Sequence, residues 1–354
     1  MSLIESARQL REFAALPPTD QSPSGRPQAG SADNPRRIGF LLLPKFSMMA
    51  FVSAVEPLRV ANRFGGALYR WEVLSETGEP VTASNGMSLV ADASLATTGR
   101  YSTVIVCAGF APETHFSRRM GAWLRRLDHE GVTLGAMDTG SFLLARAGLL
   151  DGYRATTHWE SLDSFRERFP RVEVEAGLFV FDRNRLTCAG GTAALDMMLH
   201  LIRLQHGHRL AVAVADQFVY TRIRDARDRQ RMEPQSRLGV FRSELARVVS
   251  LMEEHLEDPL TIEQISEAAG VSLRQLERLF QRHFRCTPRR YYLDLRLQRA
   301  RSLLQYTDMP VFEIALACGF GSSAHFSRSY REWAGKPPSA ERHATESETV
   351  ASPS

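Results

Sequence analysis

Lysine is almost missing from this chain of 354 residues. Only Lys45 and Lys336 among its 44 basic side chains are lysines, and the others are arginines. A GC-rich coding sequence would produce such an excess. A surface that binds phosphate and guanine would also be rich in arginine, because the planar guanidinium group contacts each of them with two hydrogen bonds at once. The net charge of +4 does not separate these explanations, so what matters is whether the arginines cluster.

Cysteine is scarce as well, and the four cysteines show no CxxC spacing. Cys107, Cys188, Cys286 and Cys318 lie among apolar or small neighbours, which is typical of reduced, buried thiols and argues against a disulfide framework or a zinc site. No run approaches the ~20 apolar residues of a membrane span, and the first residues do not resemble a signal peptide. We expect a cytoplasmic protein that needs no cofactor or metal and binds no membrane.

Strand-like and helix-like patterns alternate through the N-terminal part of the chain. The runs IGFLLL, WEVLSE, TVIVCAG, VTLGAMD and LTCAGG predict strands, and helical patterns cover 47–64, 114–131, 139–150 and 192–207. This alternation is typical of parallel βαβ units. Composition divides the chain into a disordered leader (1–35), an α/β domain with a flavodoxin-like parallel sheet (36–221), a charged linker (222–240), an all-α domain (241–343) and a disordered tail (344–354).

The arginines do cluster in the all-α part. Residues 268–343 hold 13 basic and 6 acidic side chains, a net charge of +7. The segment LTIEQISEAAGVSLRQLERLFQRHF overlaps the start of this region. It predicts a helix over 261–269, a turn at Gly270 and a second helix from Ser272, with Thr261 and Ser272 as N-caps. This pattern is typical of a helix-turn-helix, although many helical hairpins look similar.

A second copy of this layout follows about 50 residues later. Ile314 and Gly319 stand where Ile265 and Gly270 stand in the first copy. A predicted helix of about 20 residues separates the copies and spans ~30 Å. That span nearly matches the ~34 Å turn of B-DNA, at which two recognition helices reach successive major grooves on one side of the duplex. The spacing therefore predicts a protein that binds double-stranded DNA.

The run GFGSSAHFSRSYREWAGKPP, with its Gly-Phe and His-Phe-Ser-Arg steps, resembles the second helix-turn-helix of the AraC/XylS transcriptional regulators, and the resemblance covers about 247–343. Exposed side chains early in each second helix are then candidates for base contacts, and nearby arginines for phosphate contacts. The base candidates are Arg274, Gln275, Arg278, Ser323, Ala324, His325 and Arg328, and the phosphate candidates are Arg282, Arg289, Arg290 and Arg331. The alternative for Arg278 and Arg328 is that they hold the motif together or pair with Glu263, Glu267 or Glu313.

In the α/β part, the predicted strand VTLGAMD runs directly into the helix TGSFLLARAGLL, which places Asp138 at the sharp bend between them. Enzymes put a nucleophile at such a bend, because it exposes the side chain and turns helix N–H groups toward a developing oxyanion. This stretch, with VIVCAG before it and ATTHW after it, resembles the PfpI-type, class I amidotransferase-like domain. The whole chain over about 36–340 resembles the GlxA-type AraC regulators, which join that domain to a DNA-binding domain.

The catalytic relatives carry cysteine where this chain has Asp138, and a carboxylate cannot perform thiolate acyl chemistry. The resemblance therefore implies a sensor that has kept the pocket, with no catalytic residue. The rival interpretation is an amidase- or aldehyde-active domain fused to a DNA-binding domain. A turnover that is abolished by changing Asp138 would favour that rival.

The resemblance also implies a ligand site around the bend. A glutamate approaches it from the helix after the first strand, and an aromatic residue follows the position of the catalytic histidine. Carboxylates beside an aromatic face suit an ammonium or quaternary ammonium group, and backbone N–H groups suit a ligand carboxylate. We expect betaine, carnitine or a basic amino acid at a site formed by Glu56, Asp138, Thr139, Gly109, Phe110, His158 and Trp159. The alternative is that Glu56 and Asp138 cap helices or share a proton, with no cation between them.

Together these patterns predict a ligand-responsive, sequence-specific transcription regulator. We expect an activator of amine or amino-acid catabolism genes. We expect it to form a homodimer and to act on RNA polymerase. Asp196 is a weaker site candidate, for which a place on a helix surface or in a buried cap is the alternative.

Overall fold

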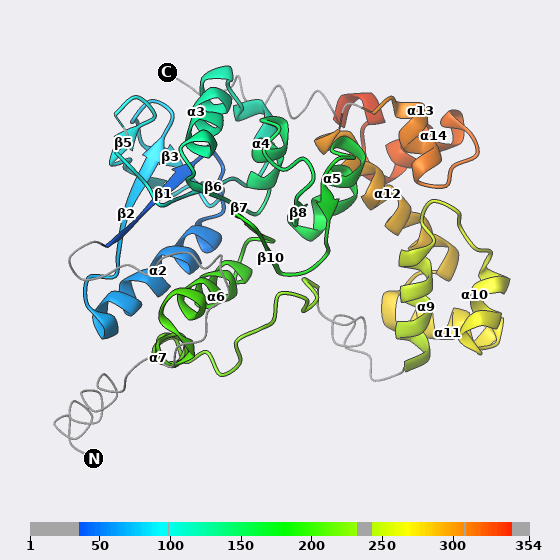
Figure 1. Ribbon diagram of the computed structural model, residues 1–354. Coiled ribbons are helices and arrows are strands. Elements are labelled where there is room, and N and C mark those ends of the chain that lie inside the picture. Colours follow the sequence, from blue (N-terminus) through cyan, green and yellow to red (C-terminus); the bar gives the residue numbers. More distant parts are fainter. Residues whose placement is uncertain (1–34, 98, 232–242, 308, 342–354) are drawn as a thin grey trace, which may run out of the picture.

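The computed structural model describes residues 35–97, 99–231, 243–307 and 309–341, which Figure 1 shows as two parts. An α/β domain precedes an all-α domain, so the predicted fold class is confirmed. Nearly all of the predicted leader, the second half of the predicted linker and the predicted tail lie outside the described residues. Within the described part, no helix is long and apolar enough to cross a membrane.

A seven-stranded sheet forms the centre of the α/β domain. Its order is β10-β11-β7-β6-β1-β2-β5, and every neighbouring pair is parallel except the β10–β11 hairpin. The middle strands are almost continuously apolar, because helices cover both faces of the sheet. The strands span Arg36–Leu42 (β1), Tyr69–Ser75 (β2), Ala93–Ser94 (β5), Thr103–Cys107 (β6), Thr133–Met137 (β7), Phe179–Asp182 (β10) and Arg185–Cys188 (β11).

Helices pack against the two faces of this sheet (Figure 1). One apolar core includes α2 (Met48–Gly65), α6 (Ala193–His206) and α7 (His208–Gln217). The other includes α3 (Arg118–His129), α4 (Gly140–Arg146) and α5 (Leu162–Arg168). The smaller elements are β3 (Val81–Thr82), β4 (Ser88–Leu89), β8 (Arg154–Ala155), β9 (Glu173–Val174) and the 3-10 turns η1 (Pro112–His115) and η2 (Trp159–Ser161).

Two predicted helices are shorter in the structure. The pattern over 114–131 was predicted as one helix, but η1 ends at His115, and α3 begins only after Ser117, whose hydroxyl caps the N–H of Met120. The pattern over 139–150 ends as a helix at Arg146, shortly before Gly148 adopts a positive φ. The strand β10 was not predicted.

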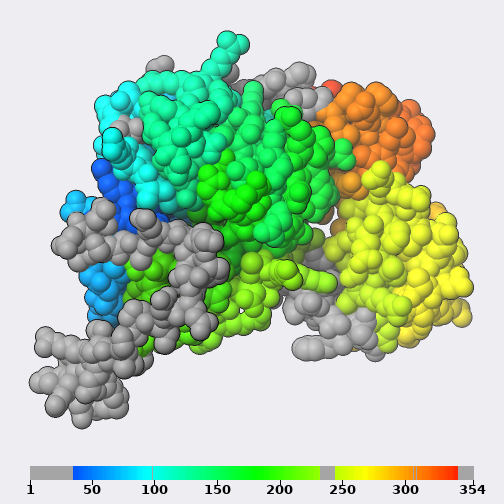
Figure 2. Space-filling view, in the orientation of Figure 1, coloured from blue at the N-terminus to red at the C-terminus, as the bar shows by residue number. Residues whose placement is uncertain are grey.

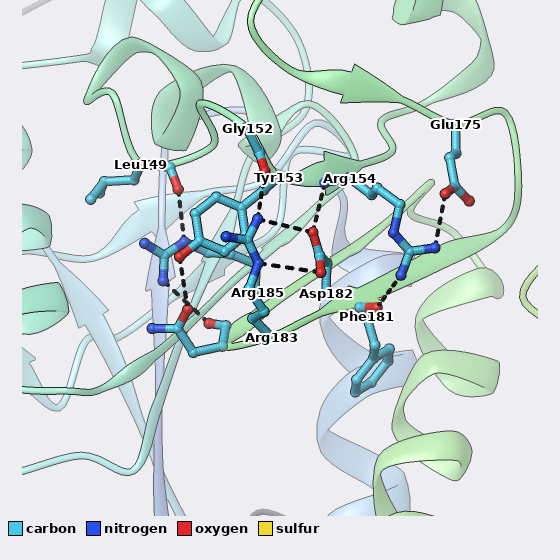
Figure 3. A network of polar contacts seen from close by, with 10 residues as sticks. Leu149, Gly152, Tyr153, Arg154, Glu175, Phe181, Asp182, Arg183 and Arg185 are labelled. Atoms are coloured by element: carbon cyan, nitrogen blue, oxygen red, sulfur yellow. Dashed lines mark hydrogen bonds and ion pairs between the residues drawn. The ribbon is translucent and has the colours of Figure 1, made fainter. Parts of the chain in front are cut away.

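A network of arginines holds the β10–β11 hairpin (Figure 3). The guanidinium carbons of Arg183 and Arg185 lie 3.5 and 4.6 Å from the ring centroid of Tyr153. Arg185 is buried, donates to the carbonyl of Leu149 and pairs with Asp128. A buried charge requires such partners. Because Arg185 begins β11, this network lies at the opposite edge of the sheet from the strand ends where parallel sheets bind ligands.

The segment after α7, residues 218–231, runs across the α/β domain and is termed the strap here. Asp196 on α6 is fully buried and accepts hydrogen bonds from the Tyr220 hydroxyl and from the N–H and Nε of Arg224. The first half of the predicted linker therefore lies on the α/β domain. Asp196 anchors it and takes neither of the roles expected for it, on a helix surface or in a cap.

The all-α domain consists of two subdomains joined by a long helix. The first contains α9 (Ser243–Glu254), α10 (Ile262–Ala269) and α11 (Leu273–Phe284), and the second contains α13 (Val311–Ala317) and α14 (Ser323–Ala334). The connecting helix α12 (Pro288–Tyr306) contributes Tyr292 to the first core and Leu297 and Leu303 to the second. In Figure 2 the subdomains form a yellow and an orange lobe beside the α/β domain.

Candidate functional site

Asp138 lies at a tight elbow between β7 and α4. Its φ of 59° is in the left-handed region, which residues other than glycine rarely adopt. The surrounding backbone is close, since a Cβ at Gly140 would lie 2.4 Å from the carbonyl oxygen of Val106, and one at Gly190 would lie 2.7 Å from the Cβ of Asp138. The bend expected from the sequence is therefore present, with a carboxyl group at its apex.

The carboxyl group of Asp138 titrates near neutrality. Burial raises its pKa to about 7, a hydrogen bond from the N–H of Thr139 acts in the opposite direction, and the charge of Glu160 raises the pKa further. The N–H of Thr139, expected to receive a ligand carboxylate, thus serves Asp138 itself. A cation at this place would stabilise the ionised form of Asp138.

The cysteines near the elbow are unreactive thiols. The carbonyl of Cys188 accepts a hydrogen bond from the N–H of Asp138, and burial raises the pKa of the Cys188 thiol to about 12. Burial also raises the pKa of Cys107. Cys318 is buried, whereas Cys286, expected to be buried, is only half-buried. The described residues contain no group of three or more His, Cys, Asp or Glu that could hold a metal ion.

The acidic neighbour of Asp138 is Glu160, whereas the sequence pointed to Glu56. The carboxylate of Glu56 is held by Arg59, whose Nε and Nη2 donate to it at 2.9 and 2.6 Å. Glu160 lies 3.8 Å from the Nδ1 of His158, and burial lowers the pKa of His158, so its imidazole is neutral at pH 7. The negative charge of Glu160 is therefore not balanced by His158.

Trp159 presents an aromatic face to a cation in this structure. Its side chain has an exposed fraction of 37%, and the guanidinium carbon of Arg231 lies 4.3 Å from its ring centroid. The other expected ligand residues take different positions. Gly109 offers its carbonyl, which accepts a hydrogen bond from the Thr139 hydroxyl, and Phe110 is exposed on the turn before η1.

The loop 156–161, termed the sensor loop, joins the elbow to the all-α domain. At one end the hydroxyl of Thr157 donates to the carbonyl of Asp138 at 2.9 Å. At the other end the carbonyl of Glu160 accepts a hydrogen bond from the hydroxyl of Ser302 on α12. Gln230 of the strap donates to the carbonyl of Thr157 at 3.0 Å. One short segment therefore contacts the elbow, the strap and the helix that connects the two subdomains.

Both helix-turn-helix units have the geometry expected from the sequence. Thr261 forms a capping box with Gln264, and Ser272 caps α11. Gly270 and Gly319 both have a φ of 71°, so the turn glycines of the two copies share one left-handed conformation. The predicted caps and turns are confirmed.

The second helix of each unit turns its candidate side chains to solvent, with the exception of Gln275, which is half-buried. The exposed candidates on these two helices are Arg274, Arg278, Arg282, Ser323, Ala324, His325, Arg328 and Arg331. Arg289 and Arg290 are also exposed, but they lie at the start of α12. Within the described part, Arg278 and Arg328 form no ion pair, so the expected alternative of pairing with nearby glutamates is not observed. Arg290, by contrast, pairs with Asp294 at 3.1 Å.

Arg296 on α12 is a structural residue that sequence reasoning did not single out. Its Nε and Nη2 donate to the carbonyls of Cys318 and Gly319 at 2.8 and 2.7 Å, and its guanidinium carbon lies 4.2 Å from the Phe320 ring centroid. It fixes the turn of the second unit. Arg231 was missed as well, because a charged run between domains is typical of a solvated linker.

Comparisons with known proteins agree with this arrangement. Residues 36–204 match the DJ-1/PfpI family, and residues 265–344 match a helix-turn-helix domain. The HTH-type transcriptional regulator CdhR of Pseudomonas aeruginosa is 52% identical over 303 residues, which cover 86% of this chain and 90% of CdhR. The HTH-type transcriptional regulator GlxA of Rhizobium meliloti is 38% identical over 318 residues, which cover 88% of this chain and 97% of GlxA.

A solved structure of an AraC family transcriptional regulator from Pseudomonas putida is 32% identical, with a TM-score of 0.49, and the match covers 52% of this chain and 100% of that chain. The relatives that match over most of their length are named as transcriptional regulators, which favours a regulator over an enzyme. The chain belongs to the HTH-type transcriptional regulators that join a DJ-1/PfpI domain to an AraC-type helix-turn-helix domain, and its function is to bind DNA and regulate transcription.

Proposed function

We propose that the α/β domain senses a small metabolite that carries an ammonium or quaternary ammonium group. Betaine, carnitine and basic amino acids are the candidate effectors. In this proposal the effector changes how the two helix-turn-helix units meet their operator. The observation that carries it is the sensor loop, because Thr157 contacts the elbow while the neighbouring Glu160 contacts Ser302 on α12.

The chemistry of the site favours a cation. Glu160 and the ionisable Asp138 supply negative charge, the neutral His158 leaves that charge unbalanced, and Trp159 supplies an aromatic face. Coulomb and cation–π attraction to such a group add in a partly buried site.

The coupling to DNA follows from the position of α12. This helix packs into the cores of both subdomains, so a shift at Ser302 reaches both recognition helices. An effector can bias DNA binding only if it has different affinities for two arrangements of these parts.

Calorimetric titration of the full chain tests the effector class. We expect glycine betaine, carnitine or arginine to bind, and Trp159→Leu to weaken that binding, because the variant lacks the aromatic face. Trp71→Leu is the control for the loss of a tryptophan, because Trp71 lies on β2 of the sheet and does not belong to the sensor loop. If none of the three compounds binds the wild-type chain, the proposed effector class is wrong.

We also propose that the protein is a homodimer. Met49 and Val52, one turn apart on α2, are exposed apolar side chains, with exposed fractions of 61% and 44%. Such a pair suits contact with a second copy of the chain. Val52→Glu should shift the mass measured by light scattering from dimer to monomer, and a wild-type monomer would contradict this part.

The final part of the proposal is that the regulator activates transcription through RNA polymerase, in the cytoplasm. Phe312 and Leu316, at i and i+4 on α13, expose apolar side chains that do not belong to a recognition helix. Transcription with purified polymerase should rise when regulator and effector are added, and fall with Leu316→Glu. A transcript level that only decreases would show a repressor.

A further inference from the structure

We propose that Arg231 is a built-in competitor of the effector's cationic group. Its guanidinium group lies over Trp159 and contacts the all-α domain, so an effector that takes the Trp159 face displaces it. This inference rests on the proposed function, since it assigns the regulation of the same site.

The first observation is that the aromatic face is already occupied by a cation. The guanidinium carbon of Arg231 lies 4.3 Å from the ring centroid of Trp159. This distance is within the ~6 Å at which a cation is attracted by an aromatic ring. An ammonium group that binds this face must therefore move the guanidinium group away. Arg231 occupies the place that an effector cation would take.

The second observation is that Arg231 stands at the end of an anchored segment. Upstream, Arg224 is held by the buried carboxylate of Asp196, and the amide of Gln230 donates to the carbonyls of Thr157 and Gly177 at 3.0 and 2.9 Å. The strap is thus fixed to the α/β domain up to the residue before Arg231. A movement of the Arg231 side chain does not require the rest of the strap to detach.

The third observation is a contact of Arg231 with the all-α domain. Its Nη1 lies 3.4 Å from Oε1 of Glu253 near the end of α9, the first helix of the all-α domain. One side chain therefore contacts Trp159 on the sensor loop and Glu253 on the first subdomain. An effector that displaces Arg231 from Trp159 separates these two contacts.

The competition has a measurable consequence. If a site is covered in some of the molecules, its apparent affinity equals the intrinsic affinity multiplied by the fraction of molecules in which the site is uncovered. Removing the guanidinium group should therefore raise the effector affinity, by on the order of 2- to 30-fold for a cation–π contact of ordinary strength. Breaking only the Glu253 contact should raise it by less, because Arg231 still covers the ring.

The experiment compares Arg231→Gln, Glu253→Gln and Arg227→Gln in the full chain, by calorimetric titration with glycine betaine, carnitine and arginine. Arg227 is an exposed arginine of the same strap and provides the matched loss of charge. We expect the affinity for the compound that binds to rise most in Arg231→Gln, to rise less in Glu253→Gln and to stay unchanged in Arg227→Gln. An unchanged or weaker affinity in Arg231→Gln would overturn the inference.

A second measurement needs no effector and separates this inference from the proposed effector class. Hydrogen–deuterium exchange of the free proteins should be faster over α9 and the sensor loop in Arg231→Gln than in the wild type and in Arg227→Gln. If no compound binds but this exchange rises, the effector class fails and the contact by Arg231 stands. If exchange is the same in all three proteins, the contact by Arg231 is rejected whatever binds.

Discussion

The guanidinium group of Arg231 lies over the indole ring of Trp159, 4.3 Å from its centroid, although the two residues are far apart in the sequence. Arg231 also pairs with Glu253 on α9. The sensor loop, the strap and the first DNA-binding subdomain thus meet at one partly exposed contact. Weak contacts of this kind are suited to change with a ligand, since breaking them costs little.

The raised pKa of Asp138 makes folding stability depend on pH. The folded protein keeps the proton up to about pH 7, whereas the unfolded chain, with the ordinary pKa of 3.8, releases it near pH 4. Between these values the unfolding free energy of the wild type falls with rising pH, by at most about 1.4 kcal/mol per unit. Asp138→Asn lacks this loss, so its advantage over the wild type should grow between pH 4 and pH 7.

Urea unfolding of both proteins at pH 5, 6, 7 and 8 checks this prediction. Asparagine is a suitable replacement because it tolerates the left-handed backbone at this position. Above pH 7 the difference between the two proteins should stay constant. A difference that is the same at every pH would show that Asp138 has an ordinary pKa.

The pair Asp196 and Arg224 should respond asymmetrically to mutation. Arg224→Ala leaves a fully buried carboxylate without its guanidinium partner, and we expect a loss of about 3–5 kcal/mol in unfolding free energy. Arg222→Ala breaks the exposed pair with Asp228 and should cost less than about 1 kcal/mol. Equal losses in the two variants, measured by urea unfolding, would contradict the role of Asp196 as the anchor of the strap.

The exposed arginines of the recognition helices should separate into two groups. Arg278→Ala and Arg328→Ala should each weaken operator binding by about 1–3 kcal/mol and relax the base preference at one position. Arg282→Ala should weaken binding to all sequences alike and reduce the slope of log affinity against log salt by about 1. Binding isotherms on selected and random duplexes at several salt concentrations measure both effects. Identical behaviour of the three variants would remove the distinction.

Arg296→Lys should damage the second helix-turn-helix unit while the first stays folded. A lysine cannot donate in the fixed geometry that reaches the carbonyls of Cys318 and Gly319 together, and it loses the planar contact with Phe320. Relative to the wild type, we expect Arg296→Lys to speed hydrogen exchange over α13 and α14 and to leave exchange over α10 and α11 unchanged. Unchanged exchange in α13 would mean that the turn is held by its apolar core alone.

Local signals explain what could be predicted from the sequence. The caps Thr261 and Ser272 and the glycines at the two turns act within a few residues, so the helix-turn-helix units were placed correctly. The elbow at Asp138 followed from a strand pattern that meets a helix pattern.

Distant contacts explain what could not be predicted. Gln230 reaches Thr156 across 74 positions, and Arg231 meets Trp159 across a similar gap. From its composition, a charged run such as the strap is expected to be solvated. Composition does not reveal that the buried carboxylate of Asp196 accepts hydrogen bonds from it. The sequence also offered no reason to discard Glu56 as the acidic neighbour of Asp138, because its pairing with Arg59 on α2 became visible only in the structure.

The central claim, a DNA-binding regulator whose two reading units respond to an effector, is tested most directly by footprinting. Duplexes selected from a random library by the full chain are probed with and without glycine betaine, carnitine and arginine. We predict that each bound protomer protects two segments about one helical turn apart on one face of the duplex, and that at least one of them changes when an effector is added. A single protected segment, or protection that no effector alters, would contradict this claim.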